Sequence, residues 1–197
     1  MSFDYDNPSI PFNPLADGLV SVVMPAYREA AGIAQAVASV HDVLQAQGMQ
    51  HEIIVIDDGS DDQTFGVLRQ LLRTCPVLRA IRLSRRFGKE GALLAGLRLA
   101  RGRAIITMDS DLQHPPDLIP RMLECWREGY SVVNGVKRDR PHDGFVTRAR
   151  ARMFNAVISR LGGIDLHNAT DFKLLDRMAL DTILTSFPEK MRFYRGL

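Results

Sequence analysis

The stretch Ile53-Ile54-Val55-Ile56-Asp57-Asp58-Gly59-Ser60-Asp61-Asp62 decides the fold class of this chain. Four consecutive apolar, β-branched residues are typical of a strand that is buried on both faces, as the strands of parallel sheets are. The run ends in two carboxylates and a glycine turn, and further acids follow where a helix would begin. A buried strand that leads through a polar turn into a helix is the repeating unit of an α/β fold.

The same alternation continues on both sides of this stretch. We expect strands at residues 19–24, 52–56, 78–83, 103–108 and 130–136, and helices at 30–47, 61–73, 90–100 and 116–128. Short apolar runs that alternate with helices of about 10–15 residues predict a mostly parallel, Rossmann-like sheet flanked by helices. Residues 1–18, with three prolines among polar residues, are expected to form a disordered arm, and residues 19–197 the folded domain.

The composition and charge of the chain limit its partners. Of its 197 residues, 46% are hydrophobic and 24% are charged, which is ordinary for a soluble globular protein. The formal net charge of +2 gives no reason to expect a nucleic-acid partner, but residues 137–197 hold 12 Lys and Arg against 7 Asp and Glu. This local basic excess favours an anionic partner such as a phosphate group or a lipid surface. Cys75 and Cys125 are isolated thiols, which favours a reducing, cytosolic compartment.

Polar residues follow the first expected strand, in Pro25-Ala26-Tyr27-Arg28-Glu29. Pro25 is expected to end the strand, so that the side chains after it lie at the carboxyl edge of the sheet, where ligands bind in such folds. Tyr27 could stack on a nucleobase, and Glu29 could accept a hydrogen bond from a ring N–H or a hydroxyl. The alternative is that Glu29 only provides a favourable acid near a helix N-terminus.

Asp57 and Asp58 end the second expected strand. An acid in this position can bind a ribose hydroxyl or a base N–H, as in dinucleotide-binding folds. Ser60 or Asp61 could simply cap the next helix. Two neighbouring carboxylates repel each other, however, so we expect a cation or hydrogen-bond donors close to Asp57 and Asp58.

Asp109 and Asp111 stand two residues apart at the end of another buried strand, and Gln113 follows two residues later. In extended geometry their side chains leave on the same side of the chain. Paired hard oxygen ligands suit Mg²⁺ or Mn²⁺, and such an ion can neutralise the charge that develops on a diphosphate leaving group. A bare Asp-x-Asp is common in loops, so the prediction rests on the position of the pair at the mouth of a strand.

A basic turn, Arg85-Arg86-Phe87-Gly88-Lys89-Glu90-Gly91, precedes the expected helix 90–100. Free backbone N–H groups and the positive end of the helix dipole favour an anion at such a place, and Lys89 adds a full charge. The spacing differs from that of the phosphate loop in NTPases. A solvated basic turn without a ligand is the alternative.

Taken together, these clusters resemble glycosyltransferase family 2, which has the GT-A fold, and especially its polyprenyl-phosphate branch of dolichyl-phosphate mannose synthases and bactoprenol-phosphate glucosyltransferases. The resemblance covers about residues 19–197 and rests on ordered motifs at residues 23–29, 55–60, 86–90, 108–116 and 171–177. It implies an inverting, metal-dependent transferase that moves a sugar from a nucleotide diphosphate, with UDP-sugars favoured, to a polyprenyl phosphate.

The resemblance also implies roles for individual residues. The nucleotide pocket would be lined by Pro25, Ala26, Tyr27, Glu29 and Asp57, with Lys89 nearby, and the metal would be held by Asp109, Asp111 and Gln113. Arg138 would face the transferred phosphate region, and Asp171, with Asn168, would sit beside the acceptor. Arg177, in the last motif, is assigned with them to the acceptor phosphate. Because a polyprenyl phosphate already carries a nucleophilic oxygen at neutral pH, no strong general base is obligatory.

Residues 145–161 bear on membrane association. Phe145, Ala149, Met153 and Val157 recur every four residues, and arginines lie between them, which is typical of a basic amphipathic helix on anionic headgroups. A helix packed on the sheet with a solvated basic side is the alternative. No apolar run reaches the roughly 18–20 residues of a membrane span. Members of the branch usually end in transmembrane helices, and residues 193–197 resemble the stretch that leads into the first of them, so the sequence is compatible with a piece of a longer protein or with a natural short form. As the chain stands, we expect it to be peripheral on the cytosolic face of the plasma membrane.

Other functions remain open on the sequence. A related transferase with a saccharide acceptor would need a base for a hydroxyl group. A nucleotidyltransferase would also use acid pairs and nucleotides, but it would release pyrophosphate. A nucleotide-sugar-binding or membrane-docking module would bind the donor without turnover, and a homo-oligomer is compatible with any of these readings.

Overall fold

The computed structural model describes residues 18–135 and 172–186. They form a six-stranded sheet with the strand order β3-β2-β1-β4-β6-β5. The strands are β1 (Val20–Ala26), β2 (His51–Asp57), β3 (Leu78–Arg82), β4 (Ala104–Thr107), β5 (Val132–Asn134) and β6 (Lys173–Asp176). The helices are α1 (Ile33–Ala46), α2 (Thr64–Leu71), α3 (Lys89–Leu99), α4 (Ile119–Arg127) and α6 (Arg177–Ser186), with a short 3-10 turn, η1 (Pro116–Leu118), before α4.

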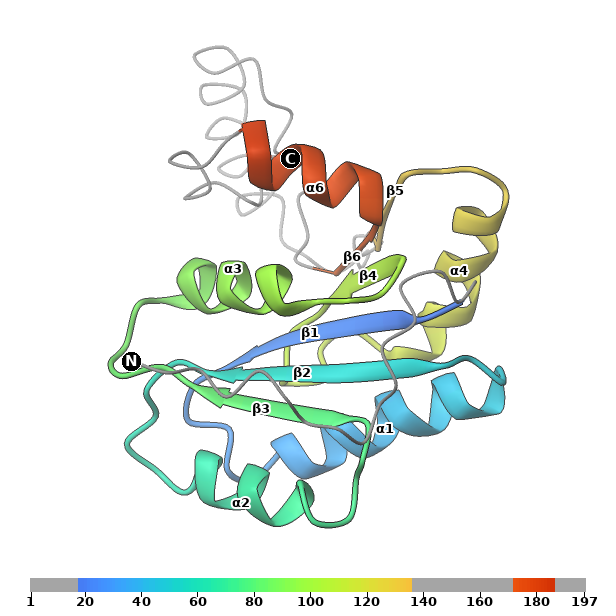
Figure 1. The fold of residues 1–197 in the computed structure, drawn as a ribbon. Coiled ribbons are helices and arrows are strands. Elements are labelled where there is room, and N and C mark those ends of the chain that lie inside the picture. Colours follow the sequence, from blue (N-terminus) through green and yellow to red (C-terminus); the bar gives the residue numbers. More distant parts are fainter. Residues whose placement is uncertain (1–17, 136–171, 187–197) are drawn as a thin grey trace, which may run out of the picture.

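The sheet is parallel on one side and antiparallel on the other. Strands β3, β2, β1 and β4 are parallel, whereas β6 runs antiparallel to both β4 and β5. The arrowheads of β1, β2 and β3 point the same way, so the carboxyl ends of these strands share one edge of the sheet (Figure 1). The predicted α/β class with a Rossmann-like parallel core is confirmed.

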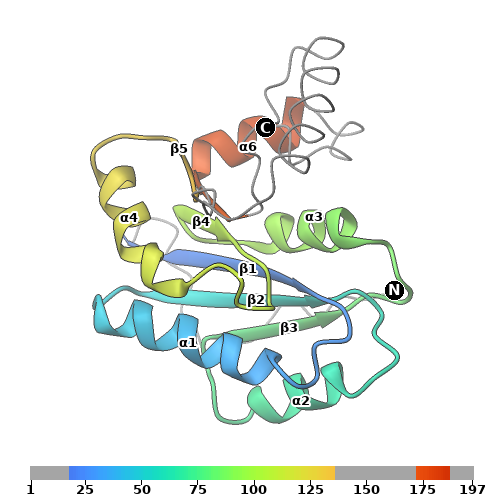
Figure 2. The same cartoon turned by 180° about the vertical axis from the view of Figure 1, so that it is seen from behind.

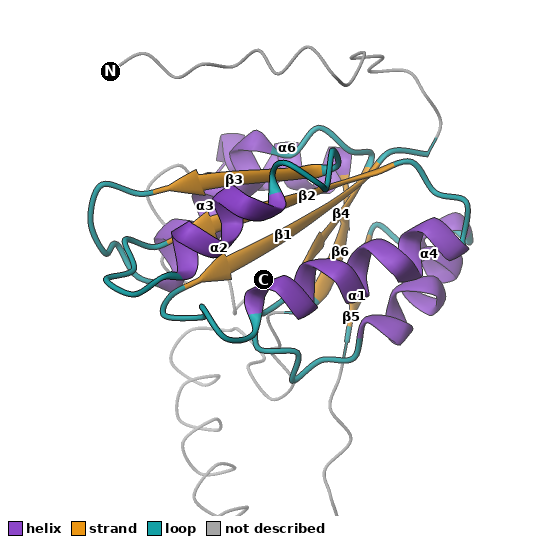
Figure 3. Cartoon of the chain, turned by 90° about the horizontal axis from the view of Figure 1, so that it is seen from below, coloured by secondary structure: helices purple, strands orange, loops and turns teal. Residues whose placement is uncertain are grey.

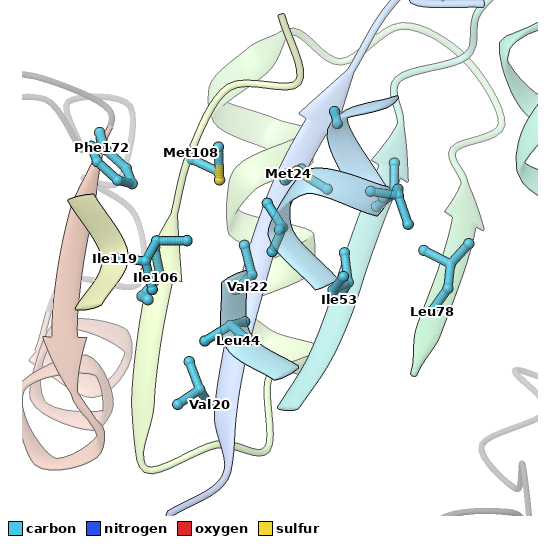
Figure 4. Close-up of a cluster of buried hydrophobic side chains, with 14 of the residues drawn as sticks. Val20, Val22, Met24, Leu44, Ile53, Leu78, Ile106, Met108, Ile119 and Phe172 are labelled. Carbon is cyan, nitrogen blue, oxygen red and sulfur yellow. The ribbon is translucent and has the colours of Figure 1, made fainter. Parts of the chain in front are cut away.

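Helices cover both faces of the sheet. Helices α3 and α6 lie on one face and α1, α2 and α4 on the other (Figures 1 and 2). Seen from below in Figure 3, α1, α2 and α4 stand in front of the strands. Side chains along β1 alternate between these layers: Val22 and Met24 join the core under α1, and Val23 joins the core under α3. Figure 4 shows the first of these two cores, where Leu44 of α1 packs over β1 and β2.

The second core is closed by a very close helix–strand contact. A methyl group on Gly96 of α3 would collide with the Val23 side chain of β1 and would come within 3.2 Å of Ile56 on β2. Glycine therefore lets α3 approach the sheet, and this approach sets the place of the basic turn that precedes the helix.

Several predicted element boundaries differ from the structure, and two of these differences lie beside the cavity. β1 does not end before Pro25 but runs through it to Ala26. Beyond Val23 the strand pairs only with β2, because β4 leaves the sheet at Thr107, and an edge position tolerates the missing N–H of proline. Helix α2 begins at Thr64 rather than at residue 61, since the Asp62 carboxylate accepts a bond from the Thr64 backbone N–H at 2.9 Å and so holds a turn ahead of the helix.

Candidate active site

The carboxyl ends of β1, β2 and β4 surround a cavity of about 220 Å³. The loop that leads into α3 closes one side of it. The cavity is lined by Pro25, Ala26, Tyr27, Glu29, Asp58, Arg86, Lys89, Asp109, Ser110 and Asp111. Most of the residues predicted at strand ends are therefore gathered in one pocket, at the edge where the topology of an α/β sheet places ligands.

The turn after β1 is held by the segment before α2. The Arg28 backbone N–H donates to Ser60 Oγ at 3.0 Å, and the Glu29 backbone N–H donates to Thr64 Oγ1 at 2.8 Å. Arg28 has a φ of 58°, a conformation that side-chain-bearing residues rarely adopt and that concentrates at functional sites. Its guanidinium points away from the cavity to Asp61, so Tyr27 and Glu29 on either side of it line the cavity.

The two acids that end β2 have different positions. Asp57 is fully buried; its Oδ1 accepts the Ser60 backbone N–H at 3.0 Å, and its Oδ2 lies 3.3 Å from Nε of Arg82. Asp58 lines the cavity and accepts the backbone N–H groups of Phe87 and Gly88 at 2.7 and 2.8 Å. The donors expected beside adjacent carboxylates are thus present. Asp57 lies beneath the cavity wall rather than in it.

The guanidinium of Arg86 lies over the ring of Tyr27. Cζ of Arg86 lies 4.1 Å from the ring centroid, and Cζ of Arg28 lies 5.4 Å from it. Arg86 lines the cavity but was not among the predicted site residues. Its place depends on the close approach of residues 85–86 to Gly59, which sequence periodicity does not reveal. The sequence signals for it were the density of basic residues just ahead of Lys89 and its place as the first residue of the motif at 86–90.

The turn after β4 brings two of the three predicted metal ligands to the cavity. Ser110 Oγ donates to the carbonyl oxygen of Pro25 at 3.1 Å and so ties the turn to β1. Asp111 Oδ1 accepts the backbone N–H of Gln113 at 3.0 Å, and Leu112 between them has a φ of 56°. Asp109 and Asp111 line the cavity in this turn, whereas Gln113 is exposed outside the lining set.

The cavity concentrates negative charge. Burial raises the pKa of the Glu29 carboxyl, and the nearby charges of Asp111, Asp62 and Asp109 raise it further. Against these acids, Nζ of Lys89 lies 2.5 Å from Oδ1 of Asp109. Lys89 is the first residue of α3, so the turn that Asp58 anchors also places this ammonium.

The residues at the cavity mouth fit a hard divalent cation. Among residues 18–135 and 172–186 no group of three or more His, Cys, Asp or Glu side chains could hold a metal by itself. Mg²⁺, however, is commonly bound by only one or two carboxylates, with water and substrate phosphates in the remaining positions. Asp109 and Asp111 provide that pair, and both line the same cavity as Glu29.

Arg177 lies at the opposite edge of the sheet. Its Nη2 donates to the carbonyl oxygens of Ala100 and Gly102, each at 2.7 Å, at the amino end of β4. The structure does not bring Arg177 to the cavity, and its role at the acceptor phosphate stays a prediction. Arg138, Asn168, Asp171 and the predicted helix 145–161 lie outside the described residues.

The sequence matches the family model described as glycosyl transferase family 2 over residues 21–195. It is 33% identical over 179 residues to a prophage bactoprenol glucosyl transferase homolog of Escherichia coli, covering 90% of this chain and 58% of that protein. It is 36% identical over 145 residues to an undecaprenyl-phosphate 4-deoxy-4-formamido-L-arabinose transferase of Edwardsiella ictaluri, covering 73% of this chain and 44% of that protein. The chain spans about half the length of the curated relatives it matches.

A solved structure supports the fold independently. The mannosyltransferase PcManGT of Pyrobaculum calidifontis, in complex with GDP-Man and Mn²⁺, superposes with a TM-score of 0.60 at 22% identity, over 87% of this chain and 48% of that one. At this identity the likeness carries the fold alone. Together with the strand order, it confirms the expected GT-A architecture.

Proposed function

The chain belongs to glycosyltransferase family 2, and from this membership we propose that it transfers a sugar from a nucleotide diphosphate sugar, with UDP-sugars favoured, to a polyprenyl phosphate with inversion at the anomeric carbon. The observation that carries the proposal is the single cavity that joins an aromatic and acidic wall, at Tyr27 and Glu29, to a carboxylate pair at Asp109 and Asp111. Such a cavity suits a ligand with a nucleoside at one end and a charged diphosphate at the other.

The nucleoside would lie between the ends of β1 and β2. Tyr27 and the guanidinium of Arg86 offer a stacked surface for a base, and Glu29 and Asp58 offer acceptors for ribose hydroxyls or ring N–H groups. Asp57 would act from below by fixing the turn at Ser60. These residues bind and orient the donor, which is the main source of rate in a reaction that needs little covalent chemistry.

The diphosphate would lie toward β4. Asp109 and Asp111 would hold Mg²⁺ or Mn²⁺, with Gln113 the third predicted ligand. A divalent ion bound there supplies charge neutralisation for the departing nucleoside diphosphate. Lys89, at the N-terminus of α3, adds a positive charge on the same side of the cavity.

The acceptor half of the proposal rests on the relatives. Two proteins of similar sequence are named as transferases acting on bactoprenol and on undecaprenyl phosphate. A phosphate monoester is largely ionised at neutral pH, so its oxygen can attack the anomeric carbon directly and invert its configuration. Asp171, with Asn168 and Arg138, remains predicted at the acceptor side, with Asp171 orienting the acceptor or balancing its charge.

A polyprenyl acceptor implies work at a membrane surface. No helix in residues 18–135 and 172–186 has the length and apolar character needed to span a bilayer. We propose that the domain acts at the cytosolic face of the plasma membrane, with the predicted basic helix 145–161 against anionic headgroups.

The test is a turnover assay with a panel of UDP- and GDP-sugars, a polyprenyl phosphate in detergent, and Mn²⁺ or a chelator. We expect release of nucleoside diphosphate coupled to a lipid-linked sugar, only with the metal present, and with one UDP-sugar preferred. Transfer to free saccharides but not to the lipid would refute the acceptor. Release of pyrophosphate would indicate nucleotidyl transfer, and donor binding without any turnover would indicate a binding module.

A further inference from the structure

Lys89 and Asp109 form an ion pair at the proposed donor site. The two side chains touch at 2.5 Å inside the donor cavity, where 34% of the Lys89 side chain and 23% of the Asp109 side chain remain exposed. Their backbones come from different parts of the sheet edge, α3 and the turn after β4. The contact therefore joins the basic turn to the acidic turn across the mouth of the cavity.

The position of Lys89 is fixed by its neighbours. The backbone N–H of Gly88 donates to Asp58, and Gly88 has a φ of 90°, which glycine adopts at no steric cost. α3 itself is held down by the contact of Gly96 with Val23. The ammonium can therefore move by changing the rotamer of a flexible side chain while its Cα stays in place.

The ammonium of Lys89 lies among several carboxylates and offsets part of their mutual repulsion. Glu29, Asp109 and Asp111 line the same cavity, so their carboxylates repel one another. Lys89 relieves this repulsion by sitting on Asp109, which is one of the two carboxylates proposed for the cation. A cation and an ammonium cannot both take the same carboxylate oxygen.

We infer that Lys89 is an exchangeable counter-ion: it occupies Asp109 while the donor cavity is empty, and it moves to the donor's diphosphate when the cation and the donor bind together. The inference deepens the proposed function and rests on it. It makes binding of the cation and the donor mutually dependent. Alone, the cation must displace Lys89 into solvent, whereas with the donor present the displaced ammonium gains a phosphate partner.

Linkage makes this coupling measurable without catalysis. If the nucleotide raises the affinity for the cation by some factor, the cation raises the affinity for the nucleotide by the same factor. Removing the Lys89 charge should change two quantities in opposite directions: the affinity for the cation alone, and the gain in that affinity when nucleotide is bound. Cation binding alone should become tighter, because the competitor is gone, and the gain caused by nucleotide should shrink, because the phosphate loses its partner.

The experiment titrates the full chain with Mn²⁺, followed by the electron paramagnetic resonance signal of free Mn²⁺, without nucleotide and with saturating UDP, and with GDP in parallel. The variants are Lys89→Met and Lys89→Gln, so that one failure to fold does not decide the result. Arg85→Met is the matched control, because it removes a neighbouring positive charge whose guanidinium lies 4.7 Å from the ring of Phe87 rather than on Asp109.

We expect wild type to bind Mn²⁺ weakly alone and at least about fivefold more tightly with UDP or GDP. The Lys89 variants should bind Mn²⁺ alone about fivefold more tightly than wild type and lose most of the nucleotide effect. Arg85→Met should follow wild type. Lys89 variants that match Arg85→Met in both states would overturn the inference and leave the proposed function standing. No Mn²⁺ binding by wild type even with nucleotide would remove the proposed metal site as well.

Discussion

The backbone N–H of Gly88 donates to Oδ2 of Asp58 at 2.8 Å, so the residue that follows β2 also fixes where α3 begins. The Phe87 N–H donates to the other oxygen of the same carboxylate at 2.7 Å. Asp58 itself is 3% exposed, and both bonds are partly buried. One buried carboxylate thus couples the acidic and basic sides of the cavity.

Asp58→Asn should therefore loosen the basic turn. The amide offers one oxygen acceptor in place of two, and its NH₂ group faces an N–H donor, so one buried donor loses its partner at a cost of about 1–3 kcal/mol. We expect that loss in the free energy of unfolding in urea, together with weaker UDP binding by calorimetry. Asp61→Asn, an exposed acid a few residues away, should leave the unfolding midpoint close to wild type. Equal stability of the two variants would contradict the anchoring role.

Gly59 and Gly48 offer a matched pair for the approach of the basic turn to β2. Both have positive φ, 67° and 64°, so alanine at either position bears the cost of a left-handed conformation, about 1–2 kcal/mol. At Gly48 a Cβ would meet nothing within 4 Å, but at Gly59 it would come within 2.6 Å of the backbone of Arg85. Gly59→Ala should cost roughly 1–3 kcal/mol more, as overpacking does.

The measurement is again urea unfolding, with UDP affinity as the second readout. Gly48→Ala should retain UDP binding, whereas Gly59→Ala should weaken it by displacing the turn that carries Arg86 and Lys89. The same loss of stability in both variants would show that the turn can shift freely, and the close approach would then have no part in placing the site.

Sequence patterns predicted the parallel half of the fold well, because β1, β2 and β4 are buried along their whole length and each contains a run of apolar residues. Strand β6 was not predicted. It spans four residues, begins with the buried Lys173 and pairs with β4 across about 70 residues of chain. Its existence depends on non-local pairing, to which local periodicity is blind.

The residues of the candidate site likewise divide into those that local sequence predicts and those whose place depends on non-local contacts. Acids at strand ends were predictable, because the carboxyl edge of a parallel sheet collects whatever follows each strand. Arg86 was missed because its place over Tyr27 depends on two loops that meet at Gly59. Arg177 was assigned from a motif alone, and the motif contained no information that β6 runs antiparallel to β4, which places the residue after β6 at the amino end of β4.

Arg86→Met should weaken donor binding without unfolding the protein. The guanidinium is exposed, lines the cavity and lies on the Tyr27 ring, so its loss removes a stacking surface and a charge but little packing. Cation–π contacts of this kind contribute about 0.5–2 kcal/mol, and we expect UDP affinity to fall by about three- to thirtyfold. Arg85→Met is the control, and a similar fall in that variant would assign the effect to general charge.

Glu29 gives the cavity a pH dependence with a definite sign. Its pKa is raised in the folded state, chiefly by burial and then by Asp111, Asp62 and Asp109. Folding therefore favours the protonated form, so the contribution of Glu29 to stability is greatest below its ordinary pKa and is lost as the pH rises through the raised value. We expect wild type to lose stability relative to Glu29→Gln as the pH rises from the ordinary glutamate pKa of 4.5 through the raised value. A stability difference that is flat across this range would contradict the carboxylate cluster.

Asp111→Asn tests the metal assignment most directly. Asp111 is exposed at the cavity mouth, and its Oδ1 accepts the backbone N–H of Gln113, a bond that the amide oxygen of asparagine can also accept, so the substitution should leave the fold intact. Replacing one of two anionic ligands with a neutral amide weakens the hold on a divalent cation, and loss of a group that stabilises developing charge lowers turnover by about 100-fold or more. The comparison is kcat/KM across a Mn²⁺ titration, with Asp117→Asn as a control that changes an exposed acid in the same segment.

Excess Mn²⁺ should restore part of the activity of Asp111→Asn, because the defect lies in cation affinity, and a chelator should abolish the activity of wild type. Near-normal turnover of Asp111→Asn at limiting Mn²⁺ would show that the departing diphosphate is stabilised by other groups, with Lys89 and Arg86 the nearest cations in the cavity.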